Sequence, residues 1–189
     1  GITEASFELV SLYYLPVEPS FELPENAVEV AITSNSKDGY ADYTFSEDFR
    51  TVTLNTIYTA SNKWGRFDFA KATESYAKVV AVFKGTADLQ ILVKVDTSST
   101  PYNNAYDSYA GNKQYFTFTE DYLVVEWDLT ALNIPSTNLE KLVFWAYDTD
   151  SGITEASFEL VSLYYLPVEG SEEGGETTPE IDYSNYEKL

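Results

Sequence analysis

Aromatic residues supply the first candidate chemistry in this chain, because sugar rings stack on aromatic faces while nearby polar groups bind their hydroxyls. Strand alternation in residues 141–147 places Val143, Trp145 and Tyr147 on one face and apolar residues on the other. A sandwich strand needs only one buried face, so this second line is either covered by a loop or exposed as a platform. The ligand-binding candidates are Trp64, Trp145, Tyr147, Tyr102, Tyr106 and Tyr109, with Asn103 and Asn104 as hydrogen-bonding neighbours.

Two of the three segments that carry these candidates are turns or loops. Residues 62–69 (NKWGRFDF) form a turn and strand interrupted by glycine, and residues 98–113 form a long polar loop with three tyrosines. Loops of that length in a compact domain tend to be functional. The competing interpretation is that Trp64 and Trp145 are buried and that the tyrosines only pack the loop. Trp127 aligns with the apolar positions of its own strand and is assigned to the core.

The residue types exclude several classes of enzyme. The chain has no His and no Cys, which excludes Ser-His-Asp and Cys-His nucleophile systems and His-ligated zinc. A carboxylate pair for glycoside hydrolysis remains, and it needs two acids facing each other across a cleft. Glu126 and Glu159 lie on strands but alternate away from the apolar line, and isolated Glu are expected among 31 acidic residues. We therefore expect a non-catalytic protein.

A metal site is the remaining chemistry in the sequence. Residues 148–152 (DTDSG) offer Asp148 and Asp150 at the alternating spacing that Ca²⁺ ligands have, without the rest of a twelve-residue loop. No cofactor is expected. A structural Ca²⁺ at Asp148 and Asp150 is the leading metal hypothesis. Residues 37–42 (KDGYAD) are similarly suggestive, and a plain turn is the competing interpretation of both segments.

The charge balance narrows the class of partner. A formal net charge of −20 repels nucleic acid and anionic membranes, and it disfavours acidic polysaccharides. No apolar run approaches a membrane span, so membrane insertion is not expected. An acidic surface of this kind is typical of a soluble protein that is secreted or displayed on the cell surface.

The pattern of elements predicts an all-β fold. Hydrophobic residues make up 44% of the chain and aromatic residues 16%, enough for a core and rich in strand formers. Roughly nine or ten short strands follow one another at about ten-residue spacing without a long helix, which indicates an antiparallel β-sandwich. Residues 28–32 alternate as one half-buried strand. Residues 79–83 and 89–95 are expected to pair as a hairpin across the turn between them.

One segment occurs twice without a mismatch, at residues 1–18 and 152–169 (GITEASFELVSLYYLPVE). Its residues Phe7, Leu9, Leu12 and Tyr14 form one apolar line if a bulge lies near Val10. Repetition at the length of a whole domain indicates a tandem array or an engineered duplication.

The duplication suggests where one module begins and ends. Residues 1–19 would be the closing strand of a preceding module, residues 20–169 one sandwich module, and residues 170–189 an acidic, Gly-rich linker and tail. The rival division starts the module at residue 1. Two identical strands then compete for one place in a sheet, and the unpaired copy is free for head-to-tail strand exchange with another molecule.

Three features resemble the jelly-roll carbohydrate-binding modules of bacterial polysaccharide-degrading or polysaccharide-adhering systems. They are residues 75–79 (SYAKV) leading into a strand, residues 125–130 (VEWDLT) ending one, and the closing segment 152–166 after an aromatic strand. Such modules often carry an Asp a few residues after the Phe of the closing strand, where this chain has Val161. The resemblance implies a non-catalytic module of a tandem, multimodular protein.

The residues and the resemblance together predict binding of a neutral polysaccharide or oligosaccharide by stacking aromatics. The alternative is a structural stalk or spacer repeat of a surface adhesin with no glycan site. That alternative requires Trp64 and Trp145 to be buried, with no aromatic groove.

Overall fold

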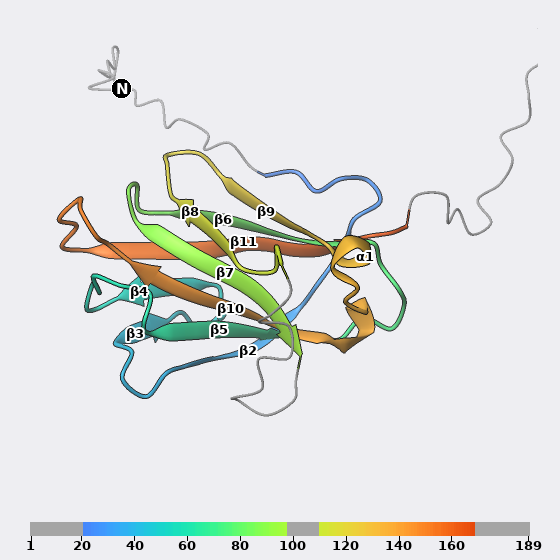
Figure 1. Cartoon of the computed structure of the whole chain (residues 1–189), viewed down its shortest axis with the longest axis horizontal. Coiled ribbons are helices and arrows are strands. Elements are labelled where there is room, and N and C mark those ends of the chain that lie inside the picture. Colours follow the sequence, from blue (N-terminus) through green and yellow to red (C-terminus); the bar gives the residue numbers. More distant parts are fainter. Residues whose placement is uncertain (1–20, 98–109, 169–189) are drawn as a thin grey trace, which may run out of the picture.

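Two antiparallel sheets face each other in the computed structural model, which describes residues 21–97 and 110–168 (Figure 1). One sheet has six strands and the other has five, and every strand pairing is antiparallel. The protein is therefore an all-β antiparallel β-sandwich, as its strand pattern predicts.

Each sheet mixes strands that are far apart in the chain. The six-stranded sheet has the order β3 (Tyr43–Phe45), β4 (Thr51–Leu54), β11 (Ala156–Leu166), β6 (Lys78–Gly85) and β9 (Leu123–Asp128), and β1 (Val28–Glu29) also pairs with β11. The five-stranded sheet has the order β2 (Ile32–Lys37), β5 (Trp64–Phe69), β10 (Leu139–Tyr147), β7 (Gln90–Thr97) and β8 (Gln114–Thr117). Two short helical turns, α1 (Leu129–Leu132) and η1 (Ser136–Asn138), connect β9 to β10. No helix among the described residues is long and apolar enough to cross a membrane.

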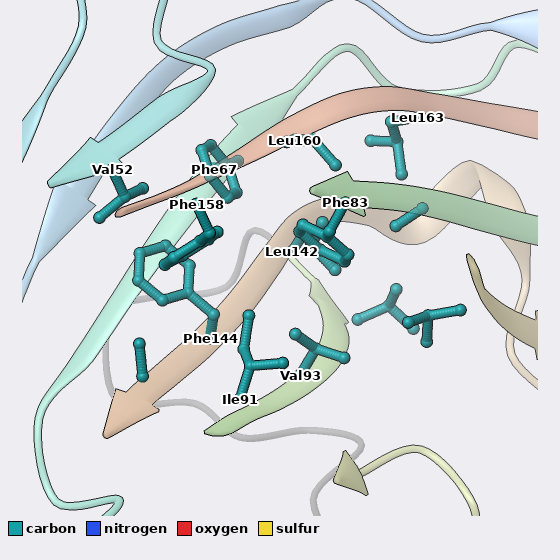
Figure 2. Close-up of a cluster of buried hydrophobic side chains, with 14 of the residues drawn as sticks. Val52, Phe67, Phe83, Ile91, Val93, Leu142, Phe144, Phe158, Leu160 and Leu163 are labelled. Carbon is teal, nitrogen blue, oxygen red and sulfur yellow. The ribbon is translucent and has the colours of Figure 1, made fainter. Parts of the chain in front are cut away.

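Aromatic rings fill the space between the sheets. Phe144 on β10 meets Phe158 on β11 edge to face at 4.9 Å between ring centroids, and it meets Phe67 on β5 at 5.3 Å. Figure 2 shows these three rings together, with Leu142 and Leu160 beside them. All three rings are at most 1% exposed. The edge-to-face contact of Phe144 with Phe158 packs one sheet against the other.

Gly65 on β5 permits the close approach of Phe144. A Cβ atom at residue 65 would lie 2.2 Å from Cζ of Phe144, far inside van der Waals contact. The glycine beside Trp64 thus has a packing role in the strand as well as breaking the alternation of side chains.

The second copy of the duplicated segment forms β11, a central strand of the six-stranded sheet. Its register with β6 shifts between Leu160 and Ser162, so a bulge lies at Val161, the residue equivalent to Val10. The bulge keeps Phe158, Leu160, Leu163 and Tyr165 in one buried core. The predicted bulge is thereby confirmed in the second copy, while the first copy, residues 1–18, lies outside the described residues.

The expected hairpin of residues 79–83 and 89–95 is wrong. β6 pairs with β11 and β9, whereas β7 pairs with β10 and β8 in the other sheet. The connecting turn therefore passes from one sheet to the other. Both strands are buried along almost their whole length, and each needs two flanking strands of its own sheet, which a mutual hairpin would have displaced.

The single strand expected at residues 28–32 is also wrong. The chain there divides into β1, which joins β11, and β2, which begins at Ile32 in the opposite sheet. Val30 lies between them, buried, with its amide donating to the carbonyl of Leu163 at 2.8 Å. The alternating pattern correctly predicts extended backbone, but it does not show that the chain passes from one sheet to the other within residues 28–32.

Candidate functional site

The outer face of the five-stranded sheet carries aromatic residues that are not part of the core. Alternation on β10 turns Leu142, Phe144 and Ala146 into the core and presents Trp145 and Tyr147 on the opposite face. Trp145 and Tyr147 are half-buried, whereas the three core residues are at most 1% exposed. We call this outer surface, over β5, β10, β7 and β8, the aromatic face.

A row of four apolar side chains crosses the aromatic face. Trp64 on β5 pairs directly with Trp145 on β10, Trp145 pairs with Leu92 on β7, and Leu92 pairs with Tyr115 on β8. Adjacent strands lie about 4.8 Å apart, so a row over three strand gaps extends for about 14 Å. We call Trp64, Trp145, Leu92 and Tyr115 the apolar row.

Exposure varies along the apolar row. Trp64 and Trp145 are half-buried, Leu92 is buried, and Tyr115 is 64% exposed. The buried Leu92 thus separates the tryptophan pair from a tyrosine that is open to solvent. Half-buried rings held in a row can offer a face to a flat ligand at little cost in conformational entropy.

Two cations orient the tryptophan rings. The guanidinium carbon of Arg66 lies 5.9 Å from the Trp64 ring centroid, and Nζ of Lys94 lies 6.0 Å from the Trp145 centroid. Arg66 lies two residues from Trp64 on β5, and Lys94 lies on β7, next to β10. Cation–π contacts at this range favour one ring orientation.

Charged residues form a band on one side of the apolar row. The cross-strand register places Lys141 directly between Asp68 on β5 and Asp96 on β7. Nζ of Lys94 lies 2.8 Å from Oδ2 of Asp96, with both residues at most 3% exposed, and Nε of Arg66 lies 3.0 Å from Oδ1 of Asp68. Every cation of the band thus has a carboxylate neighbour.

Burial lowers the pKa of Lys141, and Arg66 and Lys94 lower it further, while Asp96 and Asp68 act in the opposite direction. The lysine therefore interacts electrostatically with all four neighbouring charges. The band holds three cations and two carboxylates in mutual contact, and a compact network of this kind holds its side chains in a fixed arrangement.

Polar residues line the other side of the apolar row. Tyr147 pairs with Gln90 across β10 and β7, and Gln90 pairs with Thr117 on β8. Nε2 of Gln90 donates to Oγ1 of Thr149 at 2.9 Å. Burial raises the pKa of the Tyr147 hydroxyl, and the nearby Tyr115 raises it further. Tyr147 and Tyr115 are therefore neighbours on this face, and the Tyr147 hydroxyl stays protonated at neutral pH.

The structure brings three predicted site residues together and leaves five untested. Trp64, Trp145 and Tyr147 lie on the aromatic face, with the two tryptophans directly opposite each other in the cross-strand register. The loop candidates lie outside the described residues; they are Tyr102, Tyr106, Tyr109, Asn103 and Asn104. Trp127 is in the core as predicted, 1% exposed, with its indole N–H donating to the carbonyl of Asn112 at 2.7 Å.

Sequence reasoning missed the residues that β7 and β8 contribute to the face. Leu92 and Lys94 lie in a run of buried residues, where alternation does not distinguish the two faces, and Gln90 immediately precedes that run. Tyr115 was recognisable, because it alternates with Phe116 in a short strand whose aromatic side chains must point to opposite sides.

Asp148 holds a turn at the end of β10. Its Oδ1 accepts hydrogen bonds from the Ser151 hydroxyl at 2.6 Å and from the amides of Ser151 and Asp150, and its Oδ2 accepts from the amide of Ile153 at 2.9 Å. The Ser151 hydroxyl is the largest contribution that lowers the pKa of Asp148, to about 2. No group of three or more potential ligands that could hold a metal occurs among residues 21–97 and 110–168. Calcium at Asp148 and Asp150 stays a prediction.

The two strand glutamates lie away from the aromatic face. Glu126 on β9 and Glu159 on β11 belong to the six-stranded sheet and are exposed, as their alternation predicts. The carboxylate of Glu126 lies 2.9 Å from Nζ of Lys78, in an ion pair. These two glutamates therefore contribute nothing to the aromatic face.

Solved structures with a similar arrangement of strands include several carbohydrate-binding modules. The xylan-binding module CBM15 matches with a TM-score of 0.41 and 15% identity, over 74% of this chain and 95% of that module. CBM86 from Roseburia intestinalis, described as a low-affinity xylan-binding module, matches with a TM-score of 0.39 and 15% identity, over 72% of this chain and 88% of that module.

A structure of the glycoside hydrolase domain of Endo-D from Streptococcus pneumoniae R6 also matches, with a TM-score of 0.44 and 14% identity. The match covers 71% of this chain but only 22% of that structure, so this chain spans about a fifth of its length. No family model and no curated protein matches the chain. At these identities and TM-scores the likenesses carry no conclusion about ligand or site residues.

Proposed function

We propose that the protein is a non-catalytic module that binds a neutral polysaccharide on its aromatic face. The observation that carries this proposal is the apolar row, in which Trp64 and Trp145 lie side by side with Tyr115 at the open end. Stacking on the rings supplies affinity, and the flanking polar groups supply hydrogen bonds to hydroxyls.

The composition of the flanks supports a ligand rich in hydroxyl groups. Tyr147, Gln90 and Thr117 on one side provide both donors and acceptors. On the other side, the partly exposed ion pair of Arg66 and Asp68 provides donors and acceptors, while Lys94 and Asp96 are buried. A neutral sugar can bond to such groups without breaking an ion pair.

The electrostatics of the chain support a neutral rather than an acidic glycan. The formal net charge is −20, and Arg66, Lys94 and Lys141 each have a carboxylate beside them. An incoming carboxylate or sulfate would have to compete with Asp68 and Asp96 for these cations. It would also approach against the field of the whole molecule.

We also propose that the module works outside the cell. Polysaccharides of this kind are met outside the cell, so we place the module in a secreted or surface-displayed multimodular protein. Each module needs only weak affinity in such a protein, because binding of one module raises the effective concentration of the linked modules at the polysaccharide.

Affinity electrophoresis through gels containing xylan, starch, β-glucan or mannan tests this function. We expect retardation by at least one neutral polysaccharide, and weaker retardation of Tyr115→Ala, whose exposed ring can be removed without opening the core. Val124→Ala is the matched control, because Val124 is 50% exposed on the other sheet. The absence of retardation by every neutral glycan would overturn the proposal.

A further inference from the structure

β11 occupies a central place in the six-stranded sheet. It pairs with β6 along one edge, and with β4 and β1 along the other edge. Phe158 packs against rings from four other strands or loops, Phe67, Phe83, Phe118 and Phe144. Without an occupant in the slot, β3 and β4 would lose their connection to β6 and β9. We call this place the β11 slot.

A second segment of the same chain carries every side chain that the β11 slot requires. Residues 5–15 repeat residues 156–166 without a mismatch, including the valine at the bulge. The core residues Phe158, Leu160, Leu163 and Tyr165 thus have the counterparts Phe7, Leu9, Leu12 and Tyr14. No side-chain contact of the slot distinguishes one copy from the other.

The direction of the chain also suits the first copy. β1 runs antiparallel to β11, with Val28 opposite Tyr165 and Glu29 opposite Tyr164. If residues 5–15 lay in the slot, Val28 would face Tyr14, and residues 15–27 would form the connection of a hairpin. Antiparallel neighbours joined by a connection of this kind are the simplest strand pairing.

The connection between residues 15 and 21 is long enough for residues 5–15 to lie in the β11 slot. Phe21 packs on Tyr164 of β11 at 6.3 Å between ring centroids, and on Tyr122 at 6.0 Å. In the alternative arrangement Phe21 would cover Tyr13 in the same way. Residues 16–20 then only have to join Leu15 to Phe21, and six steps of extended chain reach about 20 Å.

We propose that the β11 slot is a binding site for residues 5–15 of the same chain, which exchange with residues 156–166. The short connection from residue 15 to β1 holds the first copy at a high effective concentration near the slot, above what a second molecule supplies in dilute solution. The exchange leaves the strands that carry the aromatic face in their own sheet, so it is independent of the proposed function.

Aspartate substitutions in the full-length chain test the exchange. Phe158→Asp places a charge in the core when residues 156–166 fill the slot. We expect Phe158→Asp to keep a cooperative unfolding transition, because residues 5–15 take its place. Phe7→Asp should unfold like the wild type, and only the double variant should lose the transition. Loss of the transition in Phe158→Asp alone would overturn the proposal.

Disulfide trapping identifies the occupant directly, because the chain has no cysteine of its own. Glu159 pairs with Thr51 on the exposed face of the sheet, so Thr51→Cys with Glu159→Cys is the positive control. Thr51→Cys with Glu8→Cys should form an intramolecular disulfide under mild oxidation. A disulfide-linked dimer from that pair, or no disulfide while the control pair forms one, would contradict exchange within one chain.

Discussion

Cross-strand register places Trp64 beside Trp145, although the two residues come from strands far apart in the chain. Arg66 and Lys94 lie against the two rings, and the ion pairs to Asp68 and Asp96 hold those cations in place. The orientation of each tryptophan therefore depends on a charged neighbour that is itself fixed. Such pre-organisation lowers the entropy cost of binding.

Asp148 gives a prediction of pH dependence at the residue scale. Its pKa in the folded protein is about 2, below the value of about 4 for an unfolded Asp. The carboxylate therefore stabilises the fold fully above about pH 4, and this contribution is lost as the pH falls from 4 towards 2. Asp148→Asn should lower the urea midpoint at pH 7, because an amide cannot accept all of these hydrogen bonds.

Urea unfolding at pH 7 and pH 3 measures the effect of Asp148. The difference between wild type and Asp148→Asn should shrink at pH 3. An equal difference at both pH values would show that the charge of Asp148 contributes nothing to the turn.

At the scale of elements, the glycine in β5 makes room for a core ring of the neighbouring strand β10. Gly65 faces the ring of Phe144, which in turn contacts Phe158 on the opposite sheet. β5 also carries Trp64 and Arg66 on its outer face. The packing of one side of this strand thus positions the candidate ligand-binding groups on the other side.

Gly65→Ala is predicted to destabilise the fold by about 1–3 kcal/mol through overpacking against Phe144. Gly39→Ala is the matched control, because no atom lies within 4 Å of a Cβ at that residue, and its effect should stay within about 0.5 kcal/mol. Chemical denaturation of the two variants makes the comparison. Equal unfolding free energies would contradict the close approach.

The sequence predicts local faces well and partners in the sheet poorly. Alternation identified the outward line of Trp145 and Tyr147 and the bulge of the duplicated strand, because both are properties of one strand. It did not reveal that β6 and β7 lie in different sheets, since both are buried on two sides and carry no alternation. The pairing of Trp64 with Trp145 is a long-range contact, and local patterns do not specify such contacts.

At the scale of the whole molecule, the acidic surface and the aromatic face have separate roles. The net charge of −20 keeps like-charged molecules apart and repels polyanions. Within the aromatic face each cation has a carboxylate neighbour, and a neutral ligand gains little from long-range attraction. Binding to a neutral polysaccharide should therefore depend on contact rather than on electrostatic steering.

The salt dependence of glycan affinity tests whether binding is independent of the net charge. The dissociation constant for a neutral glycan should change by less than about twofold between roughly 50 and 500 mM NaCl, because screening acts on exposed charges and not on stacking. Isothermal titration at the two salt concentrations measures it. A loss of affinity of tenfold or more at high salt would instead indicate recognition of a charged ligand.

The most direct test of the central claim is titration calorimetry with the neutral glycan that retards the protein most strongly. The wild type is compared with Trp64→Ala/Trp145→Ala, and circular dichroism confirms that the variant is folded. The two rings together should supply at least about 1.5 kcal/mol, so the double variant should bind more than tenfold more weakly. Unchanged affinity in a folded double variant would contradict binding on the aromatic face.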